Sequence, residues 1–170
     1  MTSIKRMEQE LRWVKETRNN IAMLLADIAD VNVLIGGSYA LKYQCDCFAD
    51  REISDYDFII KVHQKDVPKV HEFFHTLERL HLASQGYSGN GAWKLPHAYM
   101  GRHAECIIHP MDDSASIHSA RIVGRIWEKP LNVIQAKEEY VASYKAKGLE
   151  PRPKDIADIE NYYKNEDLPF

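Results

Sequence analysis

The sequence predicts an α/β (α+β) chain with a mixed β-sheet, helices flanking the sheet and a helical segment at the C-terminal end. Short apolar runs with strand character alternate with stretches of helical periodicity up to about residue 130, and helical periodicity alone follows. Hydrophobic residues make up 45% of the 170 residues and charged residues 28%, which is ordinary for one globular domain. Within that single domain we distinguish an N-terminal helix (1–29), a core (30–130) and C-terminal helices (131–170).

Each element is predicted from its apolar spacing and from the turn residues around it. Apolar residues that recur every three or four positions indicate helices, and short β-branched apolar runs indicate strands. Gly36-Gly37 predicts a tight turn between a strand and a helix, and Asp66 with Pro68 predicts a helix start. The expected elements are a helix at 3–29, a strand at 31–35, a helix from Ser38, a loop at 45–54, a strand at 57–62, a helix at 66–80, a turn-rich segment at 84–91, a hairpin of 93–100 and 103–109, a strand at 122–127, and helices at 131–147 and 154–164.

Composition narrows the classes of function. A net charge of -3 gives no general attraction to nucleic acid or to an anionic membrane. The N-terminal stretch lacks the apolar core of a signal peptide, and no apolar run approaches the ~20 residues that span a bilayer. We therefore expect a cytoplasmic protein with no membrane partner. The three cysteines do not suggest disulfides, and the spacing of Cys45 and Cys47 fits structural zinc poorly, so reduced thiols are expected.

A glycine turn is the first candidate for chemistry. Gly36 and Gly37 lack Cβ atoms, so the backbone there can turn sharply and approach a phosphate. The helix after this turn would direct free N–H groups and its positive dipole end to the same place. Ser38 could cap that helix or donate its hydroxyl to a phosphate oxygen. The alternative is a purely structural turn between a strand and a helix.

Two aspartates at the entry of the second strand are the next candidates. Asp55 and Asp57 are two residues apart, so on a strand their side chains share one face. Two nearby carboxylates repel each other, and a divalent cation with a preference for hard oxygen ligands, such as Mg²⁺, would allow both to stay ionised. The alternative is a solvated acidic turn, which the strongly apolar residues after Asp57 disfavour.

A third acid, Glu105, begins another apolar strand. A carboxylate from a neighbouring strand would complete a two-metal site or activate an attacking hydroxyl group. Taken alone, Glu105 is better explained as an edge-strand glutamate that faces water. The case for a site therefore depends on the three acids and the glycine turn occurring together.

Together these motifs resemble the nucleotidyltransferase superfamily related to polymerase beta. That superfamily combines a Gly-Gly or Gly-Ser turn, an Asp-x-Asp on the next strand and a third acid on a later strand. The chain is most similar to the small antibiotic nucleotidyltransferases and the abortive-infection toxin type, and the resemblance covers roughly residues 31–160. It departs in the long gap between the glycine turn and the first aspartate and in having Glu as the third acid. The residues that carry the resemblance are Gly36-Gly37-Ser38, Arg51, Asp55-Tyr56-Asp57, Glu105, Lys137 and Arg152-Pro153-Lys154-Asp155-Ile156-Ala157-Asp158.

The resemblance implies transfer of a nucleoside monophosphate from a nucleoside triphosphate to a hydroxyl group, with Mg²⁺ or Mn²⁺ as cofactor. Its implied catalytic and metal-binding residues are Asp55, Asp57 and Glu105, the last as ligand of a second ion or as base. It further implies that the nucleotide is bound by Gly36, Gly37, Ser38, Arg51, Ser54, Lys137 and Lys154. The acceptor stays open between a small molecule, a tRNA end and a protein side chain, and the sequence leaves a homodimer open.

Three alternative readings compete with an active nucleotidyltransferase. A protein of the same fold could bind nucleotide without catalysis and act as a regulator or as a toxin, antitoxin or phage-type interaction factor. A sugar transferase also uses Asp-x-Asp, but 170 residues is short for one and the glycine turn would have no role. A plain structural domain is the third alternative. For the C-terminal segment, Asp155 and Asp158 could also simply place acids in the first turn of a helix.

Overall fold

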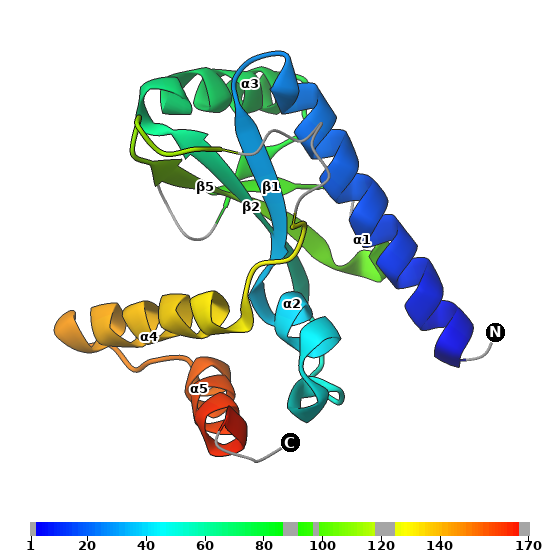
Figure 1. Ribbon diagram of the computed structural model, residues 1–170, viewed down its shortest axis with the longest axis vertical. Coiled ribbons are helices and arrows are strands. Elements are labelled where there is room, and N and C mark those ends of the chain that lie inside the picture. The colour runs from blue at the N-terminus through cyan, green and yellow to red at the C-terminus, as the bar shows by residue number, and fades with distance from the viewer. Residues whose placement is uncertain (1–2, 87–91, 97–98, 118–124, 167–170) are drawn as a thin grey trace.

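The computed structural model describes residues 3–86, 92–96, 99–117 and 125–166. The chain forms an α+β fold with an N-terminal helix, a five-stranded mixed sheet and two C-terminal helices (Figure 1). The elements are α1 (Ser3–Ala26), β1 (Val31–Gly36), α2 (Gly37–Gln44), η1 (Asp46–Phe48), β2 (Asp55–His63), η2 (Gln64–Asp66), α3 (Val67–Arg79), β3 (Ser84–Gln85), β4 (Ala92–Leu95), η3 (Tyr99–Gly101), β5 (His103–Met111), α4 (Pro130–Ala146) and α5 (Pro153–Glu166).

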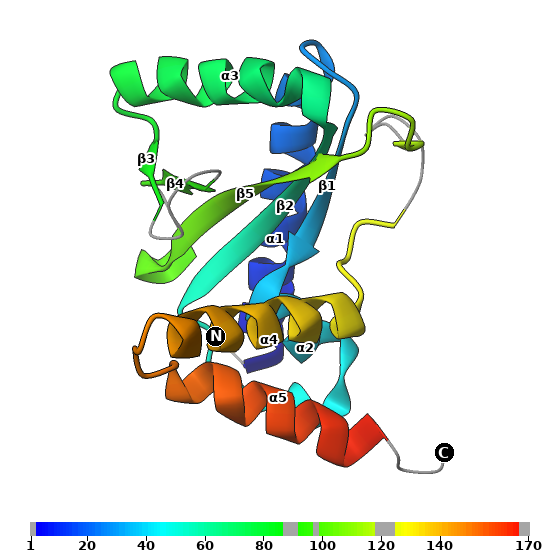
Figure 2. The ribbon, with the colours of Figure 1, turned by 90° about the vertical axis from the view of Figure 1, so that its left-hand side faces the viewer.

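The order of strands gives β2 a partner on each side. The sheet runs β1-β2-β5-β4-β3, so β2 lies between β1 and β5 (Figure 2). Strand β2 pairs antiparallel with β1 and parallel with β5, and the β5–β4 and β4–β3 pairs are antiparallel. The sheet is therefore mixed, as expected from the sequence. The parallel pairing is possible because α3 and the short strands β3 and β4 return the chain to the starting end of β2 before β5 begins.

The two faces of β2 have different roles. Its even-numbered residues, such as Tyr56 and Phe58, are buried in the main core against residues of α1 and α3. Its odd-numbered residues, among them Asp55 and Asp57, point to the opposite face because strand side chains alternate. A second, smaller core joins α2, η1 and α4 through residues that include Leu41. This second core holds the C-terminal helices beneath the end of the sheet (Figure 1).

The structure also refines several sequence predictions. Strand β2 begins at Asp55 rather than at residue 57, so both aspartates belong to the strand. The first helix ends at Ala26, three residues before the predicted end. Asp66 does flank α3, but its side chain makes no capping hydrogen bond. No helix within the described ranges is both long enough and apolar enough to cross a membrane.

Three predicted segments need correction because longer-range contacts override the local pattern. The hairpin forms, but its first strand is Ala92–Leu95, residues 97 and 98 lie outside the described residues, and residues 99–101 form a 3-10 turn. Of the predicted strand at 122–127, residues 122–124 lie outside the described residues, and in the described part Trp127 forms a parallel bridge with Ile35. Ser84 and Gln85, expected in a turn, form the short edge strand β3.

Candidate functional site

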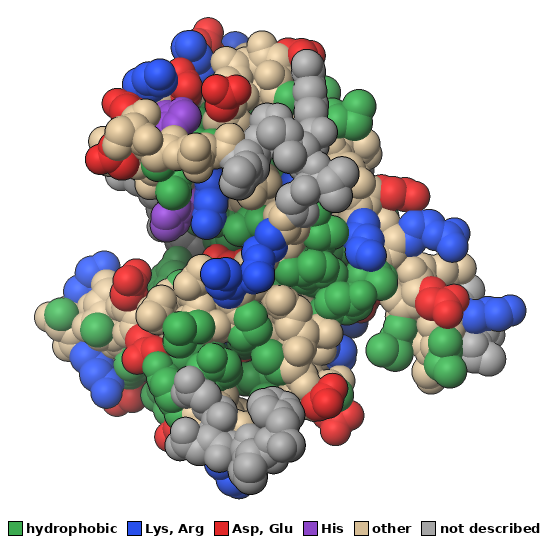
Figure 3. All heavy atoms as spheres, in the orientation of Figure 1, with side chains coloured by type: hydrophobic (Ala, Val, Ile, Leu, Met, Phe, Trp, Pro, Cys, Tyr) green, Lys and Arg blue, Asp and Glu red, His purple; other side chains and the backbone are tan. Residues whose placement is uncertain are grey.

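The three predicted acids lie on one face of two adjacent parallel strands. Asp57 of β2 is paired in register with Glu105 of β5, and Asp55 precedes Asp57 by two residues on the same face. All three side chains line one cavity of about 560 Å³ between the sheet, α2, α4 and α5. In Figure 3 the molecular surface is hollowed between the upper part that holds α3 and the lower part that holds α4.

Most of the other predicted site residues line the same cavity. They come from separate stretches of the chain: the start of α2, the loop before β2, the middle of α4 and the start of α5. These predicted residues are Ser38, Arg51, Ser54, Lys137 and Lys154. Gly36 and Gly37 are not part of the lining, but they form the turn directly next to it. The structure thus gathers residues that are up to 116 positions apart, from Ser38 to Lys154.

The glycine turn lies against the carboxylate of Asp57. Gly36 is the cross-strand neighbour of Asp57, and Gly37 comes next with a left-handed φ of 63°. A Cβ atom on Gly37 would lie 2.1 Å from Oδ2 of Asp57, a separation that only a residue without a Cβ atom can tolerate. A Cβ atom on Gly36 would in turn lie 2.7 Å from Ile59 and 2.9 Å from Oε1 of Glu128. A side chain at either position would therefore displace neighbouring side chains, and at Gly37 it would also have to adopt a left-handed conformation.

The electrostatics of the acids centre on Asp57. Burial, together with the negative charges of Glu105 and Asp55, raises the pKa of its carboxyl group to about 7, and the charge of Lys137 acts in the opposite direction. The residue as a whole keeps intermediate exposure, because it opens on the cavity. Carboxylates that repel one another in a partly desolvated place favour either a shared proton or a bound cation.

The donor set suits a hard divalent cation such as Mg²⁺. In the described residues, no three His, Cys, Asp or Glu side chains form a complete set of metal ligands. Mg²⁺ does not need such a set, because it usually keeps several waters and takes one or two carboxylates together with substrate phosphates. Asp55 and Asp57 can supply these carboxylates, because their side chains lie on the same face of β2. Glu105 fits less directly, since a Cβ atom on Gly86 would lie 2.5 Å from its Oε1, which places that oxygen toward the β3 side.

A charged network stands beside the acids and is centred on Ser38. The Ser38 hydroxyl accepts hydrogen bonds from Nη2 of Arg51 and Nζ of Lys137, each at 3.3 Å. Arg51 donates to both carboxylate oxygens of Asp158, at 2.9 and 3.0 Å. Lys137 forms ion pairs with Asp155 at 3.1 Å and with Asp158 at 3.2 Å. Two cations are thereby held at the first turn of α2 by two buried acids of α5.

Several residues of the site were not predicted as site residues. Asp155 and Asp158, which belong to the segment that carries the resemblance but were equally compatible with acids of a first helical turn, are buried partners of Lys137 and Arg51. Their spacing of three residues, which puts them on one helix face, was the available signal. Tyr140 also lines the cavity, and the Arg152 guanidinium lies 5.8 Å from the centre of the Tyr140 ring.

Glu128 is a further acid near the glycine turn. Its Oε1 accepts a hydrogen bond from the backbone N–H of Gly37 at 3.4 Å, and burial raises the pKa of its carboxyl group. The carboxylate therefore stands at the positive end of α2, where a helix favours negative charge. No motif indicated Glu128, because it lies 91 residues from Gly37 in the sequence.

The fold and the site together define an α+β protein that presents acids, a glycine turn and paired cations at the end of a mixed sheet. Comparisons of the chain with protein-family models, with curated proteins and with solved structures found no match.

Proposed function

We propose that this protein is a nucleotidyltransferase that uses Mg²⁺ or Mn²⁺ to transfer a nucleoside monophosphate from a nucleoside triphosphate to an acceptor hydroxyl group. The observation that carries the proposal is the meeting of Asp55, Asp57 and Glu105 with the turn at Gly37 in one place. The resemblance to the nucleotidyltransferase superfamily also leads us to expect this order: a glycine turn after one strand, an Asp-x-Asp on the next strand and a third acid on a later strand.

The acids take the roles that their positions allow. Asp55 and Asp57 hold the ion that accompanies the triphosphate, and Glu105 holds a second ion or accepts the proton of the acceptor hydroxyl group. When bound, the ion supplies positive charge against the phosphate oxygens. The raised pKa of Asp57 supports this assignment, because it comes from burial and from the neighbouring charges of Glu105 and Asp55, both of which a bound cation would offset.

The turn and the cations bind the leaving end of the nucleotide. The acceptor oxygen forms a bond to the α-phosphorus, the bond from that phosphorus to the β-phosphate oxygen breaks, and pyrophosphate leaves. Gly37 and Ser38 present the N-terminal end of α2 to the β and γ phosphates. Arg51 and Lys137, both within 3.3 Å of the Ser38 hydroxyl, stabilise the negative charge that develops there. Ser54 and Lys154, which also line the cavity, contact the nucleotide as well.

The test is transfer of label in the presence of the ion. The protein is incubated with each labelled nucleoside triphosphate, Mg²⁺ and a cell extract, and the labelled product is identified. We expect Mg²⁺-dependent transfer by the wild type, and none by the double variant Asp55→Asn/Asp57→Asn with its fold intact by circular dichroism. The matched control is Asp30→Asn/Asp50→Asn, which changes two exposed aspartates outside the cavity and should keep full activity. Full activity or unfolding of the Asp55→Asn/Asp57→Asn variant would overturn the proposal.

A protein of the same fold that binds nucleotide without transferring it is the second candidate. The observation that favours it is the pairing of Arg51 and Lys137 with Asp158 and Asp155, which offsets the positive charge beside Ser38. Mg²⁺-dependent binding of a nucleoside triphosphate with no labelled product from any extract would select this candidate over the enzyme.

A further inference from the structure

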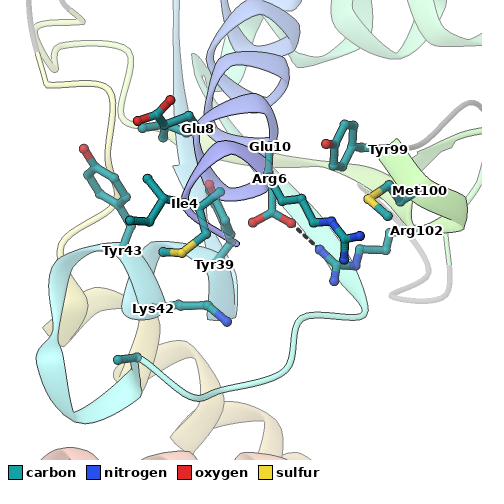
Figure 4. A pocket seen from close by; sticks show the side chains of 13 residues that line it. Ile4, Arg6, Glu8, Glu10, Tyr39, Lys42, Tyr43, Tyr99, Met100 and Arg102 are labelled. Carbon is teal, nitrogen blue, oxygen red and sulfur yellow. Dashed lines mark hydrogen bonds and ion pairs between the residues drawn. The ribbon is translucent and has the colours of Figure 1, made fainter. Parts of the chain in front are cut away.

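A second cavity, of about 660 Å³, lies on the opposite side of α2 from the acids. It is enclosed by the N-terminal half of α1, by α2 and by the turn at 99–102 (Figure 4). Among the described residues, the two cavities share no lining residue: α2 contributes Ser38 to the first, and Tyr39, Lys42 and Tyr43 to the second. The second cavity is therefore a separate site, and its ligand does not depend on the proposed nucleotidyl transfer.

Aromatic rings form much of the wall. Tyr39 is buried and packs edge-on against Tyr56, with the two ring centres 5.4 Å apart. Tyr43 is half-exposed, and Trp127 stacks on one face of its ring. The two ring centres are 4.2 Å apart and the interplanar angle is 3°. Tyr99 packs against Trp13, with the two ring centres 5.9 Å apart. Because other aromatic residues pack against these three tyrosine rings and restrict their movement, the cavity offers preformed surfaces to a flat ligand.

The rim of the cavity exposes large apolar side chains. Ile4 and Met7 of α1 are 69% and 62% exposed, and Met100 on the facing turn is 69% exposed. Figure 3 shows the N-terminal part of α1 projecting from the body with hydrophobic side chains on it. Met100 also adopts a left-handed conformation, with φ 51°, which is costly for a residue other than glycine and typical of ligand-binding segments. Apolar groups gathered around a cavity in this way indicate a binding surface.

The charges at the cavity favour an anion. Arg6, Lys42 and Arg102 line it together with Glu8 and Glu10, which leaves one positive charge in excess. The Glu10 carboxylate is already paired with a cation, since its Oε2 accepts hydrogen bonds from Arg102 and from the Tyr56 hydroxyl, the latter at 2.7 Å. Lys42 donates to the backbone carbonyl of Arg51 at 2.8 Å, and this neutral acceptor does not offset the lysine charge. In Figure 4, the Glu8 carboxylate lies at the opposite edge from Arg6 and Arg102.

We propose that this second cavity binds a small aromatic anion. Its flat ring system lies among Tyr39, Tyr43 and the apolar rim, and its carboxylate, sulfonate or phosphate group lies beside Lys42 and Arg6. A volume of about 660 Å³ accommodates a ligand of two or three fused or linked rings.

The probe for this proposal is 8-anilinonaphthalene-1-sulfonate, a fluorescent molecule with linked aromatic rings and one negative charge. We expect saturable binding at one site per chain, measured by fluorescence titration and confirmed by calorimetry. Replacing apolar rim residues by polar ones, Ile4→Gln/Met7→Gln, should weaken binding by about tenfold. The matched control is Met23→Gln/Leu24→Gln, which changes two exposed apolar residues of the same helix outside the cavity and should bind as the wild type does.

The charge requirement is tested separately. Lys42→Gln keeps a donor for the Arg51 carbonyl but removes the charge, so sulfonate binding should fall several-fold. The neutral analogue N-phenyl-1-naphthylamine should bind more weakly to the wild type and should not respond to Lys42→Gln. If Ile4→Gln/Met7→Gln loses helicity by circular dichroism, Met100→Gln on the facing turn replaces it.

Three results would overturn the proposal. The first is that Ile4→Gln/Met7→Gln, or Met100→Gln in its place, binds the sulfonate probe as tightly as the wild type does. The second is that the wild type binds the sulfonate and the neutral naphthylamine with equal affinity. The third is a concentration-dependent dimer, seen by light scattering, that Ile4→Gln/Met7→Gln disrupts, because a second copy of the chain would then occupy the cavity.

Discussion

Gly37 and Asp57 meet at the end of the sheet so closely that a Cβ atom on Gly37 would lie 2.1 Å from Oδ2 of Asp57. The φ of 63° at Gly37 turns the chain from β1 into α2, and the same turn places the first N–H groups of the helix beside the acids of β2. The glycine therefore links the two halves of the candidate site. A side chain at this position would separate them.

Replacing Gly37 by alanine should destabilise the fold more than the same replacement at a left-handed glycine that has free space around it. We expect Gly37→Ala to lower the free energy of unfolding by about 2–4 kcal/mol, since it adds a collision with Asp57 to the cost of a left-handed alanine. Gly148→Ala is the control, because Gly148 has φ 70° but nothing within 4 Å of its added Cβ atom. That control should lose only about 1 kcal/mol. Equal losses in urea denaturation of the two variants would refute the close contact.

The raised pKa of Asp57 makes a prediction about stability and pH. Its pKa is about 7 in the folded chain against an ordinary value of 3.8, so the folded state holds this proton more tightly than the unfolded state does. The contribution of Asp57 to stability is therefore greatest below pH 4 and falls as the pH rises from about 4 to 7. Asp57→Asn, which cannot lose a proton, should be more stable than the wild type at pH 8 by roughly 1–3 kcal/mol and should differ little at pH 4.

Urea denaturation of both proteins between pH 4 and 8, without divalent cations, checks this pH dependence. Mg²⁺ added at pH 8 should stabilise the wild type and not Asp57→Asn, because the ion would bind only the ionised carboxylate. A difference in stability between the two proteins that stays constant across the pH range would show that the Asp57 carboxyl group titrates normally.

Local patterns in the sequence were enough to predict most elements and the shared face of two acids. The β-branched run before Gly36 and the apolar run after Asp57 specify strands, and a period of two puts Asp55 and Asp57 on one side. The register between β2 and β5 could not be predicted in this way. It pairs Asp57 with Glu105 across 48 positions of sequence, and it is set by the burial of both strands rather than by any local signal.

The partners of Arg51 illustrate the same limit. The sequence placed Arg51 and the acids of the C-terminal segment in one resemblance, but the acids were equally compatible with the first turn of a helix. Asp158 lies 107 positions from Arg51, so their bidentate contact depends on how α5 packs against α4 and η1. Composition and periodicity carry no information about such a contact.

The pairing of Arg51 with Asp158 should hold α5 in place. Asp158→Asn would leave Arg51 and Lys137 without one of their buried charge partners, and it should lower the free energy of unfolding by about 2–4 kcal/mol. Cleavage within α5 during limited proteolysis should also become faster than in the wild type. Asp50→Asn makes the same chemical change at an exposed aspartate. It serves as the control and should change neither the free energy of unfolding nor the rate of proteolysis. Unchanged proteolysis of Asp158→Asn would indicate that apolar contacts alone dock α5.

Glu128 should weaken nucleotide binding at the proposed site. Its Oε1 accepts the N–H of Gly37 at 3.4 Å, at the end of α2 where the β and γ phosphates are proposed to lie. A carboxylate there repels a triphosphate, whereas a glutamine would keep an acceptor for Gly37 without the charge. We expect Glu128→Gln to bind a Mg²⁺–nucleoside triphosphate at least about threefold more tightly at pH 8, measured by calorimetry.

The size of this gain should depend on pH in a definite direction. Because burial raises the pKa of the Glu128 carboxyl group, protonation neutralises it at a higher pH than usual, and the advantage of Glu128→Gln should shrink as the pH is lowered toward that range. Glu52→Gln, at an exposed glutamate outside the cavity, should bind as the wild type does at every pH. Weaker binding by Glu128→Gln would mean that the negative charge itself holds the Gly37 turn in place, since the glutamine retains the hydrogen-bond acceptor and loses only the charge.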